Sequence, residues 1–219
     1  MSILEPLVRA PTKDEDRMIP KMLVMEVDDA QKPRARRVNL SGDPLISVLI
    51  RCHKTELALK LMKKMPVDVL LGDNFEGDTA LHVAAAEGDE VAAKALLDRA
   101  KELVEVKNKK NEIPLHKAVL YGNAQIFWML VNDYHSSIEA RGDEGHNVLH
   151  YAIMCGWFDL ALEIAKAHKD LAVRRNTAAV TPLQLMVTTP RAFRKTQHLG
   201  SLESLIYDCQ YSLSLYARV

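Results

Sequence analysis

The chain has 219 residues, of which 48% are hydrophobic, and its 29 basic and 29 acidic side chains give a formal net charge of zero. The two signs are interspersed, so the sequence lacks the basic footprint of a DNA- or RNA-binding protein, and we expect no nucleic-acid partner. The three cysteines, Cys52, Cys155 and Cys209, are far apart and lack the spacing of a metal or redox site. This usage fits a reducing compartment and predicts an intracellular, cytoplasmic protein.

Residues 1–40 show no helical period and mix charged residues with prolines, which predicts a loosely ordered or extended N-terminal segment. The stretch 22–27 has the composition of a strand. We interpret the basic run 32–37 as a solvated lead-in, while a nuclear-import signal or a contact with anionic lipids stays open. No stretch approaches the roughly 18 apolar residues of a membrane span, so we expect no direct membrane insertion by this chain.

From residue 43 onward the chain repeats a phrase. Leu81, Leu115, Leu149 and Leu183 lie 34 residues apart, in the phrases Thr-Ala-Leu-His, Ile-Pro-Leu-His, Asn-Val-Leu-His and Thr-Pro-Leu-Gln. At the first three leucines, alanine stands three residues later (Ala84, Ala118 and Ala152), and a glycine stands seven residues later (Gly88, Gly122 and Gly156). A second apolar run comes next. A degenerate copy, Asp-Pro-Leu-Ile at 43–46, precedes these four and is expected to cap the N-terminal end of the array.

The pattern resembles the ankyrin repeat, whose signature is Thr-Pro-Leu-His. The resemblance implies an all-α solenoid of about five helix-turn-helix repeats with short β-hairpin-like fingers. We expect residues 41–187 to form the array and residues 188–219 to form a C-terminal loop and capping helix. The polar segments 66–78, 100–112, 134–146 and 169–180 are expected to be the fingers.

One repeat illustrates the expected local structure. Thr79 stands where an N-cap would bond the free amides of the first turn, and Gly88 ends that helix as a residue tolerant of positive φ. A second helix is expected from about Glu90. Neither helix can bury its apolar face alone, so the repeats must stack to be stable.

Histidines recur at the same place in three repeats, at His82, His116 and His150. They do not predict a metal site, because equivalent positions lie about 10 Å apart at helix-packing distance, whereas zinc ligands lie about 2 Å from the ion. In the ankyrin family this histidine makes a structural hydrogen bond between neighbouring loops, and Gln184 offers comparable groups in the last repeat. We therefore expect no metal and no cofactor. The residues assigned a structural role are Leu81, His82, Gly88, Leu115, His116, Gly122, Leu149, His150, Gly156 and Leu183.

Partners of ankyrin proteins usually lie against the fingers and the first helix of each repeat, on the concave side. Carried over position by position, the exposed sites there are Val83, Ala86, Glu87, Lys117, Leu120, Tyr121, Tyr151, Met154 and Cys155. Two of these repeats are unusually apolar and aromatic, so their side chains either form a binding patch or pack against each other and the loops. The partner-binding candidates are Phe75, Lys109, Lys110, Lys117, Leu120, Tyr121, Glu144, Tyr151, Met154 and Trp157. Trp128 aligns with Lys94, which should face outward, so it is either covered by a helix–loop contact or marks a second surface.

The C-terminal sequence has a further resemblance. Thr181-Pro182-Leu183 through Pro190, Ala192-Phe193, Leu199-Gly200 and Ile206-Tyr207-Cys209 are similar to plant ankyrin proteins that continue into a membrane region with a Pro-Gly-Gly motif. These are the relatives of the accelerated-cell-death proteins, implicated in defence, cell death and stress responses. This chain has neither the motif nor the membrane helices. It is expected to be either the soluble N-terminal part of a longer protein or a truncated family member that works without membrane attachment. Leu202, Leu205 and Ile206 have the spacing of a capping helix face.

The sequence contains no phosphate-binding glycine loop, no His-Glu-x-x-His, no Gly-x-Ser-x-Gly and no paired-cysteine site, so it lacks these common catalytic motifs. This absence agrees with the ankyrin resemblance, which implies a non-catalytic protein-interaction module, and the plant resemblance places it in defence or stress signalling; this is the leading prediction. The alternative is the cytoplasmic ankyrin domain of a longer membrane-embedded signalling or channel-like protein, held at the cytoplasmic face of a membrane. An enzyme that uses Cys155 or a histidine is the least favoured hypothesis. The identity of the partner and the oligomeric state stay open.

Overall fold

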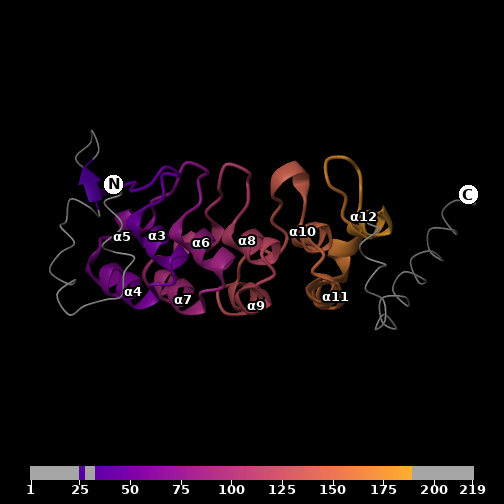
Figure 1. The fold of residues 1–219 in the computed structure, drawn as a ribbon. Coiled ribbons are helices and arrows are strands. Elements are labelled where there is room, and N and C mark those ends of the chain that lie inside the picture. Colours follow the sequence, from indigo (N-terminus) through magenta and orange to yellow (C-terminus); the bar gives the residue numbers. More distant parts are fainter. Residues whose placement is uncertain (1–24, 28–32, 189–219) are drawn as a thin grey trace, which may run out of the picture.

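The computed structural model describes residues 25–27 and 33–188 of the chain. Helices stand in two parallel rows, with loops projecting from one side of the array (Figure 1). The inner row, nearest the loops, contains α3 (Leu45–Arg51), α6 (Ala80–Glu87), α8 (Pro114–Leu120), α10 (Val148–Cys155) and α12 (Pro182–Thr188). The outer row contains α4 (Thr55–Lys64), α7 (Glu90–Arg99), α9 (Ala124–Asn132) and α11 (Phe158–Ala167). The described residues thus confirm a helical solenoid, with four helix pairs and the first helix of a fifth.

Short elements complete the described part. Two strands, β1 (Met25–Val27) and β2 (Pro33–Ala35), form an antiparallel hairpin in which Met25 pairs with Ala35. The strand-like stretch 22–27 therefore contains a strand. The connections carry α5 (Val67–Leu70) and the 3-10 turns η2 (Lys101–Glu105), η3 (Asp143–Gly145) and η4 (Lys169–Val173). The expected capping helix face at 202–206 lies outside the described residues.

The inner helices begin and end where the repeated phrase indicates. Thr79 precedes α6 in an extended conformation, and its N–H donates to Nδ1 of His82 at 3.1 Å. Gly88 ends α6 with φ +76°, in the left-handed region that glycine adopts without a Cβ penalty. A Cβ at Gly88 would also lie 3.0 Å from Oδ1 of Asn123 in the next repeat. The repeated glycine therefore serves both the turn and the close stacking of neighbouring repeats.

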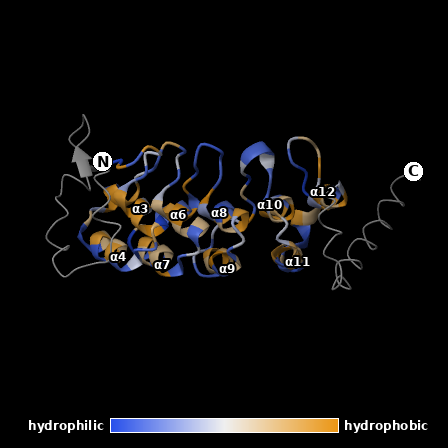
Figure 2. Ribbon diagram, viewed as in Figure 1, coloured by the Kyte–Doolittle hydropathy of each residue, from blue (hydrophilic) through white to orange (hydrophobic). Residues whose placement is uncertain are grey.

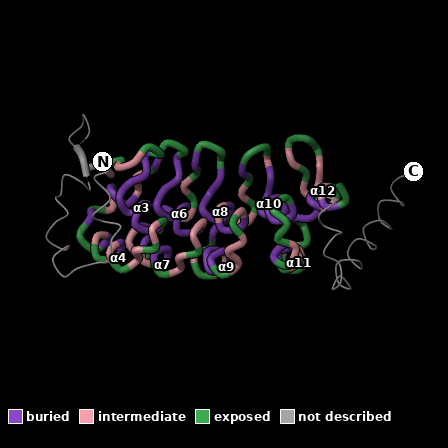
Figure 3. The backbone as a smooth tube through the Cα atoms, in the orientation of Figure 1, coloured by how far each residue is buried: buried purple, intermediate pink, exposed green. Residues whose placement is uncertain are grey.

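The core runs along the whole array between the two rows of helices. The helices are rich in apolar residues, whereas the loops are mostly hydrophilic (Figure 2) and their tips are exposed (Figure 3). Leu81, Leu115 and Leu149 are at most 2% exposed, while Leu183 is partly buried. Truncation of such a leucine to alanine typically costs about 2–5 kcal/mol of unfolding free energy. Within the described residues, no helix is long and apolar enough to cross a membrane.

The segment 66–78 differs from its expected form as a polar loop. Its first half is the helix α5, which begins after Pro66 and buries Val69 and Leu70. α5 packs against β2, and Gly72 approaches the hairpin so closely that a Cβ there would lie 2.3 Å from Cβ of Ala35. The prediction was wrong here because Val67, Val69, Leu70 and Leu71 give this segment enough apolar surface to fold against the N-terminal hairpin.

Candidate partner-binding groove

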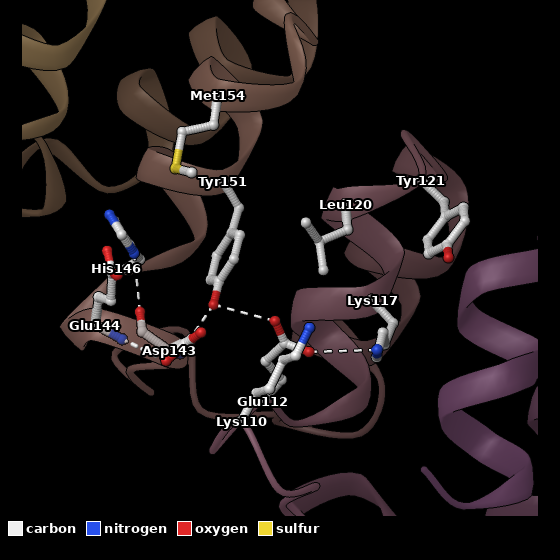
Figure 4. Close-up of a pocket in the computed structure, with 10 residues that line it drawn as sticks. All are labelled: Lys110, Glu112, Lys117, Leu120, Tyr121, Asp143, Glu144, His146, Tyr151 and Met154. Atoms are coloured by element: carbon white, nitrogen blue, oxygen red, sulfur yellow. Dashed lines mark hydrogen bonds and ion pairs between the residues drawn. The ribbon is translucent and has the colours of Figure 1, made fainter. Parts of the chain in front are cut away.

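A groove of about 470 Å³ opens between two neighbouring loops on the inner side of the array. The loop at 107–112 is called finger 2, and the loop at 141–146 is called finger 3. Helices α8 and α10, which follow these fingers, complete the walls (Figure 4). The lining residues are Lys110, Glu112, Lys117, Leu120, Tyr121, Asp143, Glu144, His146, Tyr151 and Met154.

A buried charge cluster forms one wall of the groove. Nζ of Lys117 lies 3.1 Å from Oδ2 of Asp78 and 3.3 Å from Oε2 of Glu112, and the Lys117 side chain is 15% exposed. Burial opposes the charge of the lysine, but the two carboxylates outweigh that effect and raise the pKa of Lys117 above its ordinary value. Lys117 was expected to be an exposed contact residue. The structure instead makes it the counter-ion of two buried carboxylates.

An asparagine organises most of the fingers, and it is buried at Asn74 and Asn108 and partly buried at Asn176. Asn74, Asn108 and Asn176 occupy equivalent places, and each side-chain oxygen accepts the backbone N–H of the residue four positions further on. Each amide nitrogen reaches across to the preceding repeat. The amide nitrogens lie 2.8, 2.7 and 3.1 Å from Oδ1 of Asp43, Oδ1 of Asp78 and Nε2 of His146, respectively. These bridges hold neighbouring fingers at a fixed spacing, and where the asparagine is buried its amide must find such hydrogen-bond partners.

Finger 3 lacks this asparagine, because Gly142 takes its place. The hydroxyl of Tyr151 occupies the vacated space: a Cβ at Gly142 would lie 2.4 Å from it. The hydroxyl accepts the N–H of Asp143 at 2.9 Å and donates to Oε1 of Glu112 at 3.2 Å (Figure 4). It thus joins the finger backbone to the preceding repeat, as the asparagines do. The Tyr151 ring also stands edge-on to His116, with ring centroids 5.3 Å apart.

Tyr151 was expected to be an exposed residue of a binding patch, and the prediction that it is exposed was wrong. Its side chain is 5% exposed. Burial raises the pKa of the phenol, and the nearby carboxylate of Glu112 adds to the effect. Val83, the equivalent residue of an earlier repeat, is 2% exposed and was also expected at the surface. The position that follows the repeated histidine is therefore buried in both of these repeats rather than exposed to solvent.

Replacing Tyr151 with phenylalanine should cost about 1–3 kcal/mol of unfolding free energy, because the buried Glu112 carboxylate and the Asp143 N–H lose a partner. Replacing Gly142 with asparagine alone should also destabilise the chain, since its side chain would collide with the Tyr151 hydroxyl. Combining Gly142→Asn with Tyr151→Val, the residue at position 83, should recover a large part of the loss. Urea unfolding of the two single variants and the double variant measures this coupling. Strictly additive losses would contradict the assignment.

The repeated histidines make the structural hydrogen bonds between loops that the ankyrin resemblance implies. Nδ1 of each ring accepts the N–H of the residue before its helix, so the proton lies on Nε2 and is donated to a carbonyl of the following loop. Nε2 of His82, His116 and His150 lies 3.0, 3.2 and 3.0 Å from the carbonyl oxygens of Glu112, Ala140 and Val180. Burial lowers the pKa of all three imidazoles, and that of His116 to about 4. Oε1 of Gln184 accepts the N–H of Thr181 at 2.9 Å, as the histidines do for their own loops.

Two candidate contact residues project from the inner helices beside the groove. Tyr121, at the end of α8, is 59% exposed, and Met154, in α10, is 51% exposed. Leu120 is partly buried and lies between Tyr121 and Tyr151 in the view of Figure 4. These three residues, together with Lys110 on finger 2 and Glu144 on finger 3, are the predicted contacts that the structure gathers at the groove with accessible surface.

Other predicted contacts lie elsewhere. Phe75 stands at the tip of the preceding finger, where its ring packs against Gly42 and lies 5.1 Å from the guanidinium of Arg37. Trp157 covers Gly122, and its Nε1 donates to the carbonyl of Leu120 at 3.2 Å, which makes it mainly a bridge between repeats. Lys109 is exposed on finger 2 but does not line the groove.

The structure also shows the surroundings of Trp128 and Cys155. Nε1 of Trp128 donates to Oε2 of Glu163 in α11 at 2.9 Å, so the neighbouring outer helix, rather than a loop, partly covers the indole. Cys155 is exposed at the end of α10, and partial desolvation of its sulfur raises the pKa of the thiol, which disfavours a nucleophilic thiolate. In the part of the chain that the structure describes, no group of histidine, cysteine and acidic residues is arranged to hold a metal ion.

Three lining residues were missed by the sequence analysis: Glu112, Asp143 and His146. Glu112 and His146 stand at the same finger position as Asp78, four residues after the finger asparagine or its glycine substitute. That register could have marked them as groups that the following repeat reaches. Asp143 had no such signal, because its place at the rim depends on the turn η3.

Comparisons with known proteins agree with this architecture. The family model described as Ankyrin repeats (3 copies) matches residues 45–141 and 91–176, which together span more than half of the chain. The chain is also similar to the rat protein "Glutaminase liver isoform, mitochondrial", with 31% identity over 106 residues. That similarity covers 48% of this chain and 17% of the relative.

Proposed function

The chain belongs to the ankyrin-repeat family, and from this we propose that it is a non-catalytic interaction module that holds a segment of a partner protein in the groove between fingers 2 and 3. Tyr121 and Met154 carry the proposal, because two large apolar side chains from successive inner helices are more than half exposed beside one groove. Exposed aromatic and methionine side chains of this kind commonly act as anchors in protein interfaces.

The rigidity of the groove supports the same proposal. The Lys117 ion pairs, the Asn108 bridge to Asp78 and the Tyr151 bridge to Glu112 fix the two fingers before a ligand arrives. A preorganised surface loses less conformational entropy on binding than a flexible one. The scaffold can therefore use its exposed side chains for contact while the buried polar groups maintain the spacing of the walls.

Replacing both Tyr121 and Met154 with alanine should reduce capture of bound proteins by about tenfold or more, because interface anchors often contribute at least 1–2 kcal/mol each. The measurement is affinity capture from a plant cell lysate followed by quantitative mass spectrometry and cross-linking to locate the bound segment. Val91→Ala is the matched control, since Val91 is an apolar residue of α7 that is 57% exposed on the outer row. Equal capture by all three proteins, with unchanged melting temperatures, would refute the groove as the binding site.

We also propose the setting of this module: plant defence or stress signalling, with the chain working on its own or as the cytoplasmic repeat domain of a longer membrane protein. The support is the resemblance of residues 181–209 to plant ankyrin proteins that continue into a membrane region. Sequencing the complete transcript from its source is the direct test. A coding region that continues beyond Val219 into apolar spans would favour the longer protein.

A further inference from the structure

Building on the proposed function, we propose that the groove selects an extended segment that carries an arginine or lysine, with its cation directed to the acidic tip of finger 3 and its aliphatic stem lying against Tyr121 and Met154. The groove and its two exposed apolar side chains define the site. The charges around it decide which kind of segment fits.

The buried wall of the groove carries an uncompensated negative charge. Glu112 and Lys117 line the groove, and Asp78 lies behind them as the second partner of Lys117, so the cluster holds two carboxylates and one ammonium. The imidazoles of His82 and His116 lie next to these carboxylates but are uncharged at neutral pH, because burial lowers their pKa. The wall therefore has a net charge of −1. Because the cluster is buried, solvent screens this charge less than it would screen a surface carboxylate.

The rim adds two more carboxylates. Asp143 and Glu144 are exposed at the tip of finger 3. Oδ1 of Asp143 accepts the N–H of Glu144 at 3.0 Å, and among the described residues neither side chain forms an ion pair with a cation. Lys110 on finger 2 is the opposing charge. Three carboxylates and two ammonium groups thus line the groove, and Asp78 behind Lys117 brings the net charge of the cluster and rim to −2, which is complementary to a basic segment.

The apolar side chains suit the same occupant. The methylene groups of arginine and lysine lie favourably along apolar surfaces while their charged ends stay near water or carboxylates. Tyr121 can also receive a cation on the face of its ring. An acidic segment would gain only Lys110 as a partner and would be repelled by Asp143, Glu144 and the buried wall.

A random heptapeptide library displayed on phage and selected on the full chain tests this inference. We expect the wild type to enrich peptides that combine arginine or lysine with an apolar residue. The variant Asp143→Asn/Glu144→Lys should lose that enrichment. The matched control Glu56→Lys/Asp68→Asn makes the same change in net charge at exposed positions of α4 and α5, away from the groove, and should keep the enrichment.

Synthetic versions of the enriched peptide provide the quantitative test by fluorescence anisotropy. Replacing its basic residue with glutamine should weaken binding about tenfold or more, whereas Lys110→Glu in the protein should strengthen binding of the original peptide several-fold, as expected for charges facing each other across an interface. Enrichment of neutral or acidic peptides that still depend on Tyr121 and Met154 would overturn the preference for a cation and leave the proposed groove intact. A library with no peptide dependent on those two residues would count against both.

Discussion

Lowering the pH from 7 to 5 should reduce the free energy of unfolding by roughly 2 kcal/mol through His116 alone, with His82 and His150 acting in the same direction. Burial lowers the pKa of His116 to about 4 in the folded chain, while an unfolded histidine titrates near 6.5. Between these values the unfolded chain binds a proton that the folded chain excludes. The contribution of His116 to the unfolding free energy is therefore fully present above pH 6.5 and is lost progressively as the pH falls toward 4.

The measurement is urea unfolding of the full chain at pH 7, 6 and 5, a range chosen to stay above the ordinary titration of carboxylates. His116→Gln is the informative variant, because Gln184 accepts the equivalent backbone N–H in the last described repeat without titrating. The variant should be less stable than the wild type at pH 7 but should show a shallower loss on acidification. An unchanged pH dependence in this variant would mean that His116 does not exclude the proton.

Replacing Lys117 with methionine should cost about 3–5 kcal/mol, because removing one partner of a buried ion pair leaves the other charge uncompensated. Here two carboxylates, Asp78 and Glu112, would remain buried together without their cation. The methionine retains most of the aliphatic volume, so the loss would arise from charge rather than from a cavity. Urea or thermal unfolding at pH 7 gives the magnitude.

Two further variants separate this effect from a general effect of lysine. Lys110→Met removes an exposed cation from finger 2 and should change the unfolding free energy by less than about 0.5 kcal/mol. Adding Glu112→Gln to Lys117→Met should recover part of the stability, because it removes one of the two stranded charges. If Lys117→Met proved as mild as Lys110→Met, the proposed burial of the cluster would be incorrect.

The repeat architecture could be predicted because it depends on local patterns that recur every 34 residues. Leu81 and its equivalents, the turn glycine at Gly88 and the histidine bond all repeat the same local chemistry, and the structure places them as the pattern indicates. The start of α7 at Glu90 was likewise visible from the end of the preceding turn. These features need no knowledge of the neighbouring repeat beyond its existence.

The candidate site was less predictable because equivalent positions have different surroundings. Positions 83, 117 and 151 hold valine, lysine and tyrosine. Whether such a side chain is buried depends on the groups that the adjacent finger places next to it. Lys117 is drawn inward by Asp78 and Glu112, whereas Tyr151 is drawn inward by the space above Gly142. Position in the repeat alone suggested exposure for all three. Only the pairing of side chains between repeats reveals their burial.

Finger 3 has Gly142 and Tyr151 in place of the asparagine of the other fingers, and this limits where the chain can be joined to repeats of other proteins in a chimera. A crossover between positions 142 and 151 would deliver either a tyrosine that collides with an asparagine or a glycine whose vacancy nothing fills. The phenol also needs the carboxylate of Glu112, which the preceding repeat supplies. The smallest unit that can be grafted into another array therefore runs from finger 2 through α10. A chimera cut between finger 3 and α10 would separate Tyr151 from Gly142 and lose the contacts that join the two repeats.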